Sequence, residues 1–467
     1  MGGAAGAGRA SRADKAELAL AALAIAAVAL TLVLRILAAR GQPLTTDETF
    51  TLMITSQHAL GDFIREARRD VAAPLYYTVM HFLPVGMSDT GMRLPSWAFM
   101  IAGSALPLLW RIPNQPRSAA IAWAALLFLW LPGAIFAVQA RPYALLFLTA
   151  TGQTIAFAQL MEEPSLRRAF VWTATASLTL LTHYMSAPLG LAQGLVLLFA
   201  VRGRASRLWP SLLVLLIPLV EAVTHYRQLT SFASSDANWL PKISFSNVGE
   251  YLTYGLGPLG FVLLLIALAS RYLNRSEAMP RGATLASSAG AIALAILIGA
   301  GWHRSLIVDR YLTACAPALM LALVTIAATT IGRLLLVAVA AGLGIFASAF
   351  APLEIREHSM EWAVNKLVPY QPKKVVFSLA NKGQETLAPE TGEELGAVLF
   401  RRAGVETQAR LVPTMNGREL IAAADKETAI IWVFSPNRQP LAKMIARQRR
   451  CYIAPMQLAC PPRSATP

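Results

Sequence analysis

Charged side chains are scarce in this chain of 467 residues. Asp, Glu, Lys and Arg make up only 14% of it, hydrophobic residues make up 55%, and the mean hydropathy is +0.50. These values exclude an ordinary soluble globular protein. Long runs without any charge recur over the first 350 residues, as in a protein that crosses a membrane many times.

Acidic residues are scarcer than basic ones, with 26 against 41, and the net charge is +15. The basic residues lie in short clusters between apolar segments instead of forming one patch. We therefore attribute the charge to membrane topology, with membrane lipids as partners and no nucleic acid.

Cysteine is rare as well, with three residues in the chain. Cys315 lies in an apolar run, whereas Cys451 and Cys460 share the C-terminal tail. The latter two can form a disulfide if the tail lies outside the cytoplasm. The sequence leaves open whether they do.

About 20 apolar residues are needed for each membrane crossing. The apolar segments predict about eleven spans, near 17–39, 92–110, 118–137, 142–160, 168–184, 187–201, 208–224, 249–270, 283–301, 307–328 and 333–351. The first is preceded by basic residues like a signal peptide, but it is span-length and no convincing cleavage site follows, so we expect an uncleaved span.

The segment 71–86 is ambiguous, because it is short and contains Pro74 and Pro84. It follows a stretch in which Leu60, Phe63 and Ile64 alternate with charges at helical spacing, as in an interfacial amphipathic helix. If 71–86 does not cross, the basic residues of the short loops fall almost entirely on one side, which the positive-inside rule assigns to the cytoplasm. We therefore predict a cytoplasmic N-terminus and an external C-terminus.

Residues 353–467 have a different composition. Buried-strand patterns at 375–379 and 429–434, a weaker one at 408–412, and helical patterns at 391–403 and 417–425 predict a small extracytoplasmic α/β domain. It has no Gly-rich phosphate loop, so nucleotide binding there is not expected. The predicted organisation is a mainly α, polytopic membrane helix bundle over 1–352, with an outer loop at 40–91, followed by this domain.

Polar side chains at the external ends of the spans are candidates for function, because ionisable groups in an apolar bundle are costly. Asp47 and Glu48 follow the first span, and the polar loop 225–248 is long enough to cover a cavity mouth. The other external groups are Asp70, Arg93, Arg141, Tyr143, His183, Tyr184, His225, Tyr226, Trp302, His303, Arg304, Asp309, Arg310 and Tyr311.

Carboxylates and arginines together suit sugar transfer from a lipid-linked phosphate. One carboxylate can remove the acceptor proton, and arginines stabilise the leaving phosphate bidentately. Other interpretations stay open for single residues. Arg93 and Arg141 can be snorkelling arginines, and Tyr76, Tyr77, Tyr143 and Tyr311 can belong to an aromatic belt.

Four dispersed motifs agree with one family. They are Thr46-Asp47-Glu48, Asp70-Val71-Ala72-Ala73-Pro74-Leu75-Tyr76-Tyr77 with the nearby Arg93-Leu94-Pro95, Gln139-Ala140-Arg141-Pro142-Tyr143, and Arg310-Tyr311-Leu312 onward to Pro317. In order and spacing, over roughly residues 17 to 350, the chain resembles bacterial glycosyltransferases akin to protein O-mannosyltransferases and lipid A aminoarabinose transferases, of the GT-C superfamily.

The resemblance implies an inverting transfer of a sugar from a polyprenyl-phosphate donor to a lipid, glycan or protein acceptor, on the periplasmic face of a bacterial inner membrane. It implies Asp47 as the catalytic carboxylate with Glu48 assisting, and Arg141 and Arg310 on the donor phosphate. Arg304 is added to these two by its proximity in the sequence only. We expect substrate contacts from Asp70, Tyr76, Tyr77, Arg93, Tyr143, His303 and Tyr311.

The chain departs from the family at one point, since the usual Asp-x-His-Pro pattern is replaced by Asp70-Val71-Ala72-Ala73-Pro74. Any role of that histidine in donor or metal binding is therefore in doubt. The reaction requires no bound nucleotide and the residues make no cofactor certain, while a divalent metal held by Asp47 and Glu48 stays open.

Two rival functions remain. A transporter or flippase of lipid-linked saccharides would place ionisable groups at mid-bilayer and show related halves. A polymerase or ligase of lipid-linked saccharides would carry a large arginine-rich outer loop. The chain shows none of these features clearly, so the transferase is the favoured hypothesis.

Overall fold

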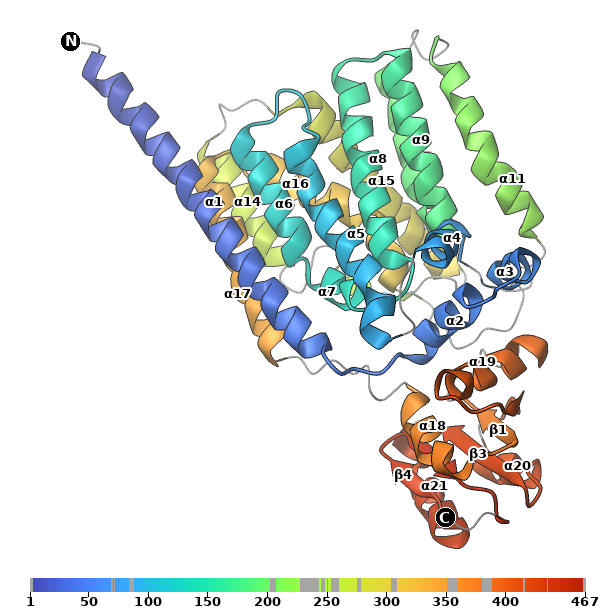
Figure 1. Cartoon of the computed structure of the whole chain (residues 1–467). Helices are drawn as coiled ribbons and strands as arrows, with labels where there is room; N and C mark the ends of the chain where they lie inside the picture. The colour runs from blue at the N-terminus through green and yellow to red at the C-terminus, as the bar shows by residue number, and fades with distance from the viewer. Residues whose placement is uncertain are drawn as a thin grey trace.

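The structure is a computed structural model that describes residues 3–68, 70, 72–83, 88–201, 207–226, 243–244, 248–249, 251–252, 260–274, 279–303, 309–350, 359–379, 389–414, 416–434 and 436–464. It has two parts (Figure 1): a bundle of long helices, and a small α/β domain that carries the C-terminus and lies at one end of the bundle. Short helices α2 (Thr46–Thr55), α3 (Leu60–Ala67) and α4 (Leu75–Phe82) lie at the same end.

The mainly helical architecture agrees with the prediction. The bundle helices are α1 (Gly3–Ala39), α5 (Asp89–Leu109), α6 (Arg117–Leu129), α7 (Leu131–Ala137), α8 (Tyr143–Glu162), α9 (Leu166–Thr182), α10 (Ala187–Ala200), α11 (Leu216–Thr224), α14 (Gly260–Leu273), α15 (Arg281–His303), α16 (Ala316–Ile326) and α17 (Thr330–Phe350). Short 3-10 helices η1 (Tyr184–Ser186), η3 (Trp209–Leu215) and η4 (Asp309–Ala314) precede α10, α11 and α16.

Four helical segments of the described chain are long and apolar enough to cross a membrane: Asp14–Ala39, Tyr143–Glu162, Arg281–His303 and Thr330–Ala349. Five more apolar helices are shorter, with 10–17 residues. The chain is therefore a multi-pass membrane protein, and the count of eleven spans stays a prediction.

Helix α8 forms the centre of the bundle. In its most apolar window of 18 residues, 83% of the residues are buried, compared with 28% in the corresponding window of α1. Helix α1 packs on the outside of the bundle, against α6 and α17. Small residues bring the inner helices close together. A Cβ on Gly290 of α15 would lie 2.4 Å from the Cβ of Ala318 on α16, so only glycine permits this approach.

The region between α1 and α5 does not contain a further span among its described residues. Helix α4 has only eight residues, about 12 Å at 1.5 Å per residue, and a bilayer core is about 30 Å thick. This agrees with the prediction that 71–86 does not cross. The amphipathic helix is also confirmed as α3, which buries Phe63 and exposes Leu60 and Ile64 to 57% and 40%.

The C-terminal domain contains a five-stranded sheet in the order β2-β1-β3-β5-β4. Strands β1 (Lys374–Ser378), β2 (Gln408–Leu411) and β3 (Thr428–Val433) are parallel, and β4 (Tyr452–Ala454) and β5 (Gln457–Cys460) form an antiparallel hairpin that extends the sheet from β3. Its helices are α18 (Glu361–Leu367), α19 (Pro389–Arg402), α20 (Gly417–Ala422) and α21 (Gln439–Arg449), with 3-10 turns η6 (Val368–Tyr370) and η8 (Pro436–Arg438).

The three predicted strands and two predicted helices of this domain are confirmed as β1, β2, β3, α19 and α20. The hairpin was not predicted, because β4 and β5 have only three and four residues and lie in a tail with little alternation. The domain boundary at residue 353 stays a prediction, since 351–358 lie outside the described residues.

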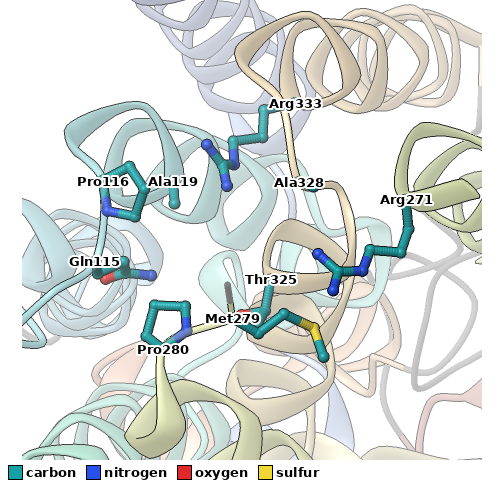
Figure 2. Close-up of a pocket in the computed structure, with 9 residues that line it drawn as sticks. All are labelled: Gln115, Pro116, Ala119, Arg271, Met279, Pro280, Thr325, Ala328 and Arg333. Carbon is teal, nitrogen blue, oxygen red and sulfur yellow. The ribbon is translucent and has the colours of Figure 1, made fainter. Parts of the chain in front are cut away.

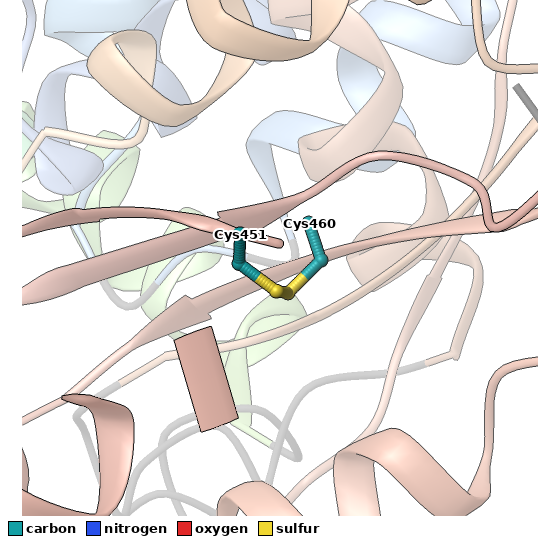
Figure 3. The surroundings of a disulfide bond; sticks show 2 residues. All are labelled: Cys451 and Cys460. Carbon is teal, nitrogen blue, oxygen red and sulfur yellow. A yellow bond between two sulfur atoms is a disulfide. The ribbon is translucent and has the colours of Figure 1, made fainter. Parts of the chain in front are cut away.

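The hairpin carries the disulfide that the sequence left open. Cys451 and Cys460 are bonded, with their Cα atoms 4.2 Å apart, so the bond closes β4 against β5 (Figure 3). Cys315 is buried in the bundle as a free thiol.

Replacing Cys451 and Cys460 together by serine is expected to destabilise the C-terminal domain by about 2.5 kcal/mol, the loop entropy that a cross-link over a nine-residue separation removes from the unfolded chain. Limited proteolysis at rising temperature measures this loss. Cys315→Ser tests for general effects of cysteine removal, and equal protease resistance with and without the 451–460 bond would contradict the expectation.

The domain packs directly on the short helices. Helix α19 contacts α2, and its Glu394 Oε1 accepts from Nε2 of Gln57, just after α2, at 3.3 Å. Its Arg402 pairs with Asp89, the first residue of α5, at 2.5 Å. Apolar side chains of α2, α4 and the sheet belong to one continuous buried cluster. The domain is thereby attached to the helix that begins at the predicted acidic motif.

Candidate active site

Helix α2 begins with a capping box that fixes its first turn. The Thr45 hydroxyl accepts from the Glu48 amide at 3.2 Å, and the Glu48 carboxylate accepts from the Thr45 amide at 2.8 Å. Asp47 and Glu48 are thus the second and third residues of the helix. Neighbours on a helix point about 100° apart, so the two carboxylates face different surroundings.

Glu48 faces inward and is completely buried. Its Oε1 and Oε2 accept from Nε and Nη2 of Arg93 at 2.7 and 2.6 Å, and Oε1 also accepts from the Ala140 amide at 2.8 Å. Arg93 further donates to the carbonyl oxygens of Gln42 and Pro43 at 2.6 and 2.8 Å. These hydrogen bonds connect the segment that follows α1 with helices α2 and α5 and with the turn before α8.

Asp47 faces outward. Its Oδ2 lies 3.2 Å from Nη1 of Arg310 in η4, and the two side chains are 45% and 31% exposed. The residues are 263 positions apart in the chain. The Asp47 carbonyl oxygen also accepts from Arg141 Nη1 at 3.2 Å, so two of the three predicted phosphate-binding arginines meet the predicted catalytic residue.

Arg141 lies deeper and joins Asp47 to a second carboxylate. Its Nη1 is 3.5 Å from Asp70 Oδ2 and donates to the Tyr77 hydroxyl at 3.2 Å, while that hydroxyl donates to Asp70 at 2.5 Å. The side chains of Arg141 and Asp70 are each 11% exposed. The buried Nε of Arg141 has no hydrogen-bond partner among the described residues.

The charge state of Asp70 follows from these contacts. Burial alone would raise the pKa of its carboxyl, but the Arg141 guanidinium, the Tyr77 hydroxyl and the Ala72 amide outweigh burial and hold the pKa below its usual value. Asp70 is therefore an anion that orients Arg141.

Aromatic rings form the wall behind the arginines. The His183 ring lies 4.9 Å from Tyr311 and 5.9 Å from Tyr143, and the Arg310 guanidinium lies 5.8 Å from the centre of the Tyr143 ring. His183 Nδ1 accepts from the Met185 amide at 3.2 Å. The sequence placed His183 on this side of the membrane but gave it no role.

The remaining predicted site residues differ in position. Tyr76 is fully buried in the cluster shared with the C-terminal domain, against Tyr77. His303 is exposed at the end of α15 and forms no hydrogen bond or ion pair with the residues that the structure describes. Arg304 and most of the loop 225–248 lie outside the described residues.

Two contributions to the site could not be found from the sequence. These are the Ala140 amide and the carbonyl oxygens of Gln42 and Pro43. Backbone groups carry no residue-type signal. The conspicuous turn Gln139-Ala140-Arg141-Pro142 pointed to Arg141 alone.

Asp47 and Glu48 do not fit a shared divalent-metal site. Both Glu48 oxygens already accept from the Arg93 guanidinium and backbone amides, and a cation there would lie beside that guanidinium. The described part of the chain also contains no group of three or more His, Cys, Asp or Glu suited to a metal.

His183 makes the stability of the folded protein depend on pH. Burial, together with the Arg141 and Arg310 charges, outweighs Asp70 and lowers its pKa to about 4, below the value of 6.5 in an unfolded chain. The unfolded state therefore binds more protons between these values. The free energy of unfolding therefore has its full value above pH 6.5 and decreases as the pH drops toward 4. At pH 5 it is lower by about 2 kcal/mol.

Thermal melts of the wild type and His183→Gln between pH 7.5 and 4.5 measure this effect. The wild type is expected to lose melting temperature through this window, and the variant is expected to lose less. His58→Gln, which replaces an exposed histidine, serves as the control. Identical pH curves for the wild type and His183→Gln would refute the assignment.

Comparison with known proteins gives two results. No family model matches the chain, and no curated protein matches it either. Among solved structures, the crystal structure of ArnT from Cupriavidus metallidurans in the apo state is similar, with a TM-score of 0.59 and 15% identity, over 93% of this chain and 97% of that one.

The crystal structure of the same ArnT bound to undecaprenyl phosphate is also similar, with a TM-score of 0.57 and 14% identity, over 93% and 97% of the two chains. ArnT is a lipid A aminoarabinose transferase with a GT-C fold. The resemblance in fold that the four motifs predicted is therefore confirmed.

Proposed function

We propose that this protein is a glycosyltransferase that moves a sugar from a polyprenyl-phosphate donor to an acceptor hydroxyl or phosphate. The observation that carries the proposal is the meeting of Asp47, Arg310 and Arg141 at one end of a membrane helix bundle. The similar ArnT has been solved with undecaprenyl phosphate, a lipid of the donor class that two convergent arginines suit.

In the proposed reaction the acceptor oxygen attacks the anomeric carbon of the donor. The bond from that carbon to the phosphate oxygen breaks, a bond to the acceptor oxygen forms with inversion, and polyprenyl phosphate leaves. Asp47 accepts the proton of an acceptor hydroxyl, which its 45% exposure permits. Arg310 and Arg141 stabilise the negative charge on the departing phosphate.

Glu48 and Arg93 have a different role in this proposal from the one that the sequence suggested. With its oxygens engaged by Arg93 and backbone amides, Glu48 is a positioning residue. Through the Ala140 amide it holds the turn that carries Arg141. Asp70 and Tyr77 orient the guanidinium of Arg141 from the other side.

We place the site on the periplasmic face of a bacterial inner membrane. The basic residues of the short loops gather at the opposite end of the bundle, and the 451–460 disulfide suits an oxidising compartment. The C-terminal domain lies on the same side as the site and packs on α2, so we assign it to acceptor access.

Binding of undecaprenyl phosphate to the purified protein tests the arginine assignment. Arg310→Gln is expected to weaken binding about tenfold or more, because a hydrogen bond to a charged group contributes about 1.5–3 kcal/mol. Arg65→Gln, on the same side of the protein and 57% exposed, is the matched control. Equal affinity of the wild type and Arg310→Gln would contradict the proposal.

A second experiment tests the reaction class. Mass spectrometry of envelope lipids and glycans from a deletion strain is expected to show one glycan lacking a terminal sugar, together with accumulated polyprenyl-phosphate sugar. An accumulated intermediate on the cytoplasmic leaflet alone, with no missing linkage in a reconstituted assay, would favour the flippase instead.

A further inference from the structure

A second group of arginines lies at the opposite end of the bundle from Asp47. Helix α5 (Asp89–Leu109) carries Arg93 in its second turn at the candidate site, and its 21 residues span about 30 Å to the loop that contains Gln115. Likewise η4 carries Arg310 before α16, and Thr325 lies at the far end of α16. The two sites are therefore separated by about the thickness of a bilayer core.

A small pocket opens between the helix ends there (Figure 2). It is lined by Gln115, Pro116, Ala119, Arg271, Met279, Pro280, Thr325, Ala328 and Arg333. The guanidinium groups of Arg271 and Arg333 and the Gln115 amide point toward its centre, and they come from α14, α17 and the loop before α6. None of the described lining residues carries a carboxylate.

Gln115 indicates that the pocket takes a polar ligand. Its side chain is only 6% exposed, and neither its Oε1 nor its Nε2 has a hydrogen-bond partner among the described residues. A buried amide without partners costs about 1–3 kcal/mol, so a ligand or water that satisfies it is favoured. Its backbone is held in place, because its carbonyl oxygen accepts from Arg111 at 3.1 Å.

The charge of the ligand follows from the surroundings. Arg333 is 5% exposed and donates to the Ser118 hydroxyl at 2.9 Å, which fixes its guanidinium at the pocket wall. Pro116 and Pro280 immediately precede α6 and α15, and the first turns of α6, α15 and α17 contain no acidic residue. Helix N-termini and arginines both favour an anion.

An anion is already seated at one of these helix ends. The carboxylate of Glu162, from α8, accepts from the Gly282 amide in the first turn of α15 at 2.7 Å. Glu162 itself does not line the pocket, and none of the described lining residues is acidic.

The size of the pocket limits the ligand. Its volume of about 20 Å³ is slightly more than a single water requires, so it excludes a nucleotide base or a sugar ring. It can admit one or two oxygens of a tetrahedral oxyanion whose ester substituent stays outside. Arginine forks match phosphate oxygens in geometry, and anionic lipid headgroups at a membrane face carry phosphate groups.

We propose that the pocket between Gln115, Arg271, Thr325 and Arg333 binds a phosphate oxyanion, at a site separate from the proposed transferase centre. The same chemistry is offered by the headgroup of an anionic phospholipid and by free phosphate. The site is independent of the proposed function, because it shares no residue with the Asp47 cluster.

The test uses the full-length protein in detergent, with two probes. Native mass spectrometry measures the affinity for phosphatidylglycerol, with the zwitterionic phosphatidylcholine, which has no net charge, as the comparison, and thermal melts measure stabilisation by millimolar inorganic phosphate. Arg271→Gln is expected to weaken binding of the favoured probe about tenfold, the usual effect of losing a hydrogen bond to a charged group. Gln115→Leu, which removes the amide but no charge, is expected to weaken it too.

Two controls separate the pocket from general charge effects and from the transferase centre. Arg167→Gln removes an exposed arginine at the same end of the bundle and is expected to bind the probe like the wild type. The pocket variants are also compared in an Arg310→Gln background, so that lipid bound beside Asp47 is not counted as binding to the pocket.

Pocket-dependent binding of phosphatidylglycerol identifies a lipid site, and pocket-dependent stabilisation by inorganic phosphate identifies a free-phosphate site. Each outcome supports the proposal. Unchanged affinities in both Arg271→Gln and Gln115→Leu, or no binding of either probe, would overturn the proposal. The pocket would then hold only water.

Discussion

Asp47→Asn is expected to lower the turnover of sugar transfer about a hundredfold to ten-thousandfold, the usual contribution of a positioned general base. The asparagine keeps the size of the side chain and its place in the first turn of α2, but it cannot accept the acceptor's proton. Stability should change little, because the pair with Arg310 is 45% and 31% exposed and such pairs contribute about 0–1 kcal/mol.

A transfer assay with a polyprenyl-phosphate sugar, combined with a thermal melt, measures both quantities. Asp62→Asn is a closely matched control: its side chain is also 45% exposed and is paired with an arginine, at 2.7 Å, on the neighbouring helix α3. Full activity in Asp47→Asn, with the control also active, would exclude Asp47 as the base.

Arg93→Met is expected to destabilise the protein by about 3–5 kcal/mol, because it leaves the Glu48 carboxylate buried without its counter-charge. Glu48→Gln is expected to have an effect of similar size, since Arg93 then loses its only anionic partner among the described residues. Transfer activity should fall in both variants, because the Ala140 amide and hence the Arg141 turn lose their anchor.

Detergent-to-SDS unfolding curves measure this loss, and the double variant Glu48→Gln with Arg93→Met gives the coupling. We expect the double variant to be less destabilised than the sum of the single ones, since neither charge is then left alone. Glu163→Gln, which breaks the exposed pair with Arg168, should cost less than about 1 kcal/mol. Additive effects of the two buried substitutions would argue against a shared network.

The two experiments distinguish the neighbouring carboxylates by kind of effect. Loss of Asp47 should remove activity and preserve the fold, whereas loss of Glu48 should reduce both. This contrast could not be derived from the pair Asp47-Glu48 in the sequence, where both side chains have the same chemistry. It results from their positions on α2, one turned to Arg310 and the other to Arg93.

Local patterns predicted the parts of the fold that depend on local chemistry. The apolar runs predicted a membrane helix bundle, because each span requires about 20 apolar residues wherever it lies. Alternating apolar and charged residues predicted α3, and short runs of branched and aromatic residues predicted β1 and β3. The hairpin β4–β5 was not predicted, because strands of three and four residues are too short to show a clear alternation of apolar and polar residues.

The sequence by itself also determined which polar residues share one end of the bundle, since each crossing reverses the chain and the basic loops fix the other end. Only the tertiary structure decided their partners. Arg310 and Asp47 are 263 residues apart, and whether such groups touch depends on how helices pack and rotate, which no local pattern records. For the same reason the burial of Glu48, the aromatic wall around His183 and the arginine pocket near Gln115 emerged from the packed bundle alone.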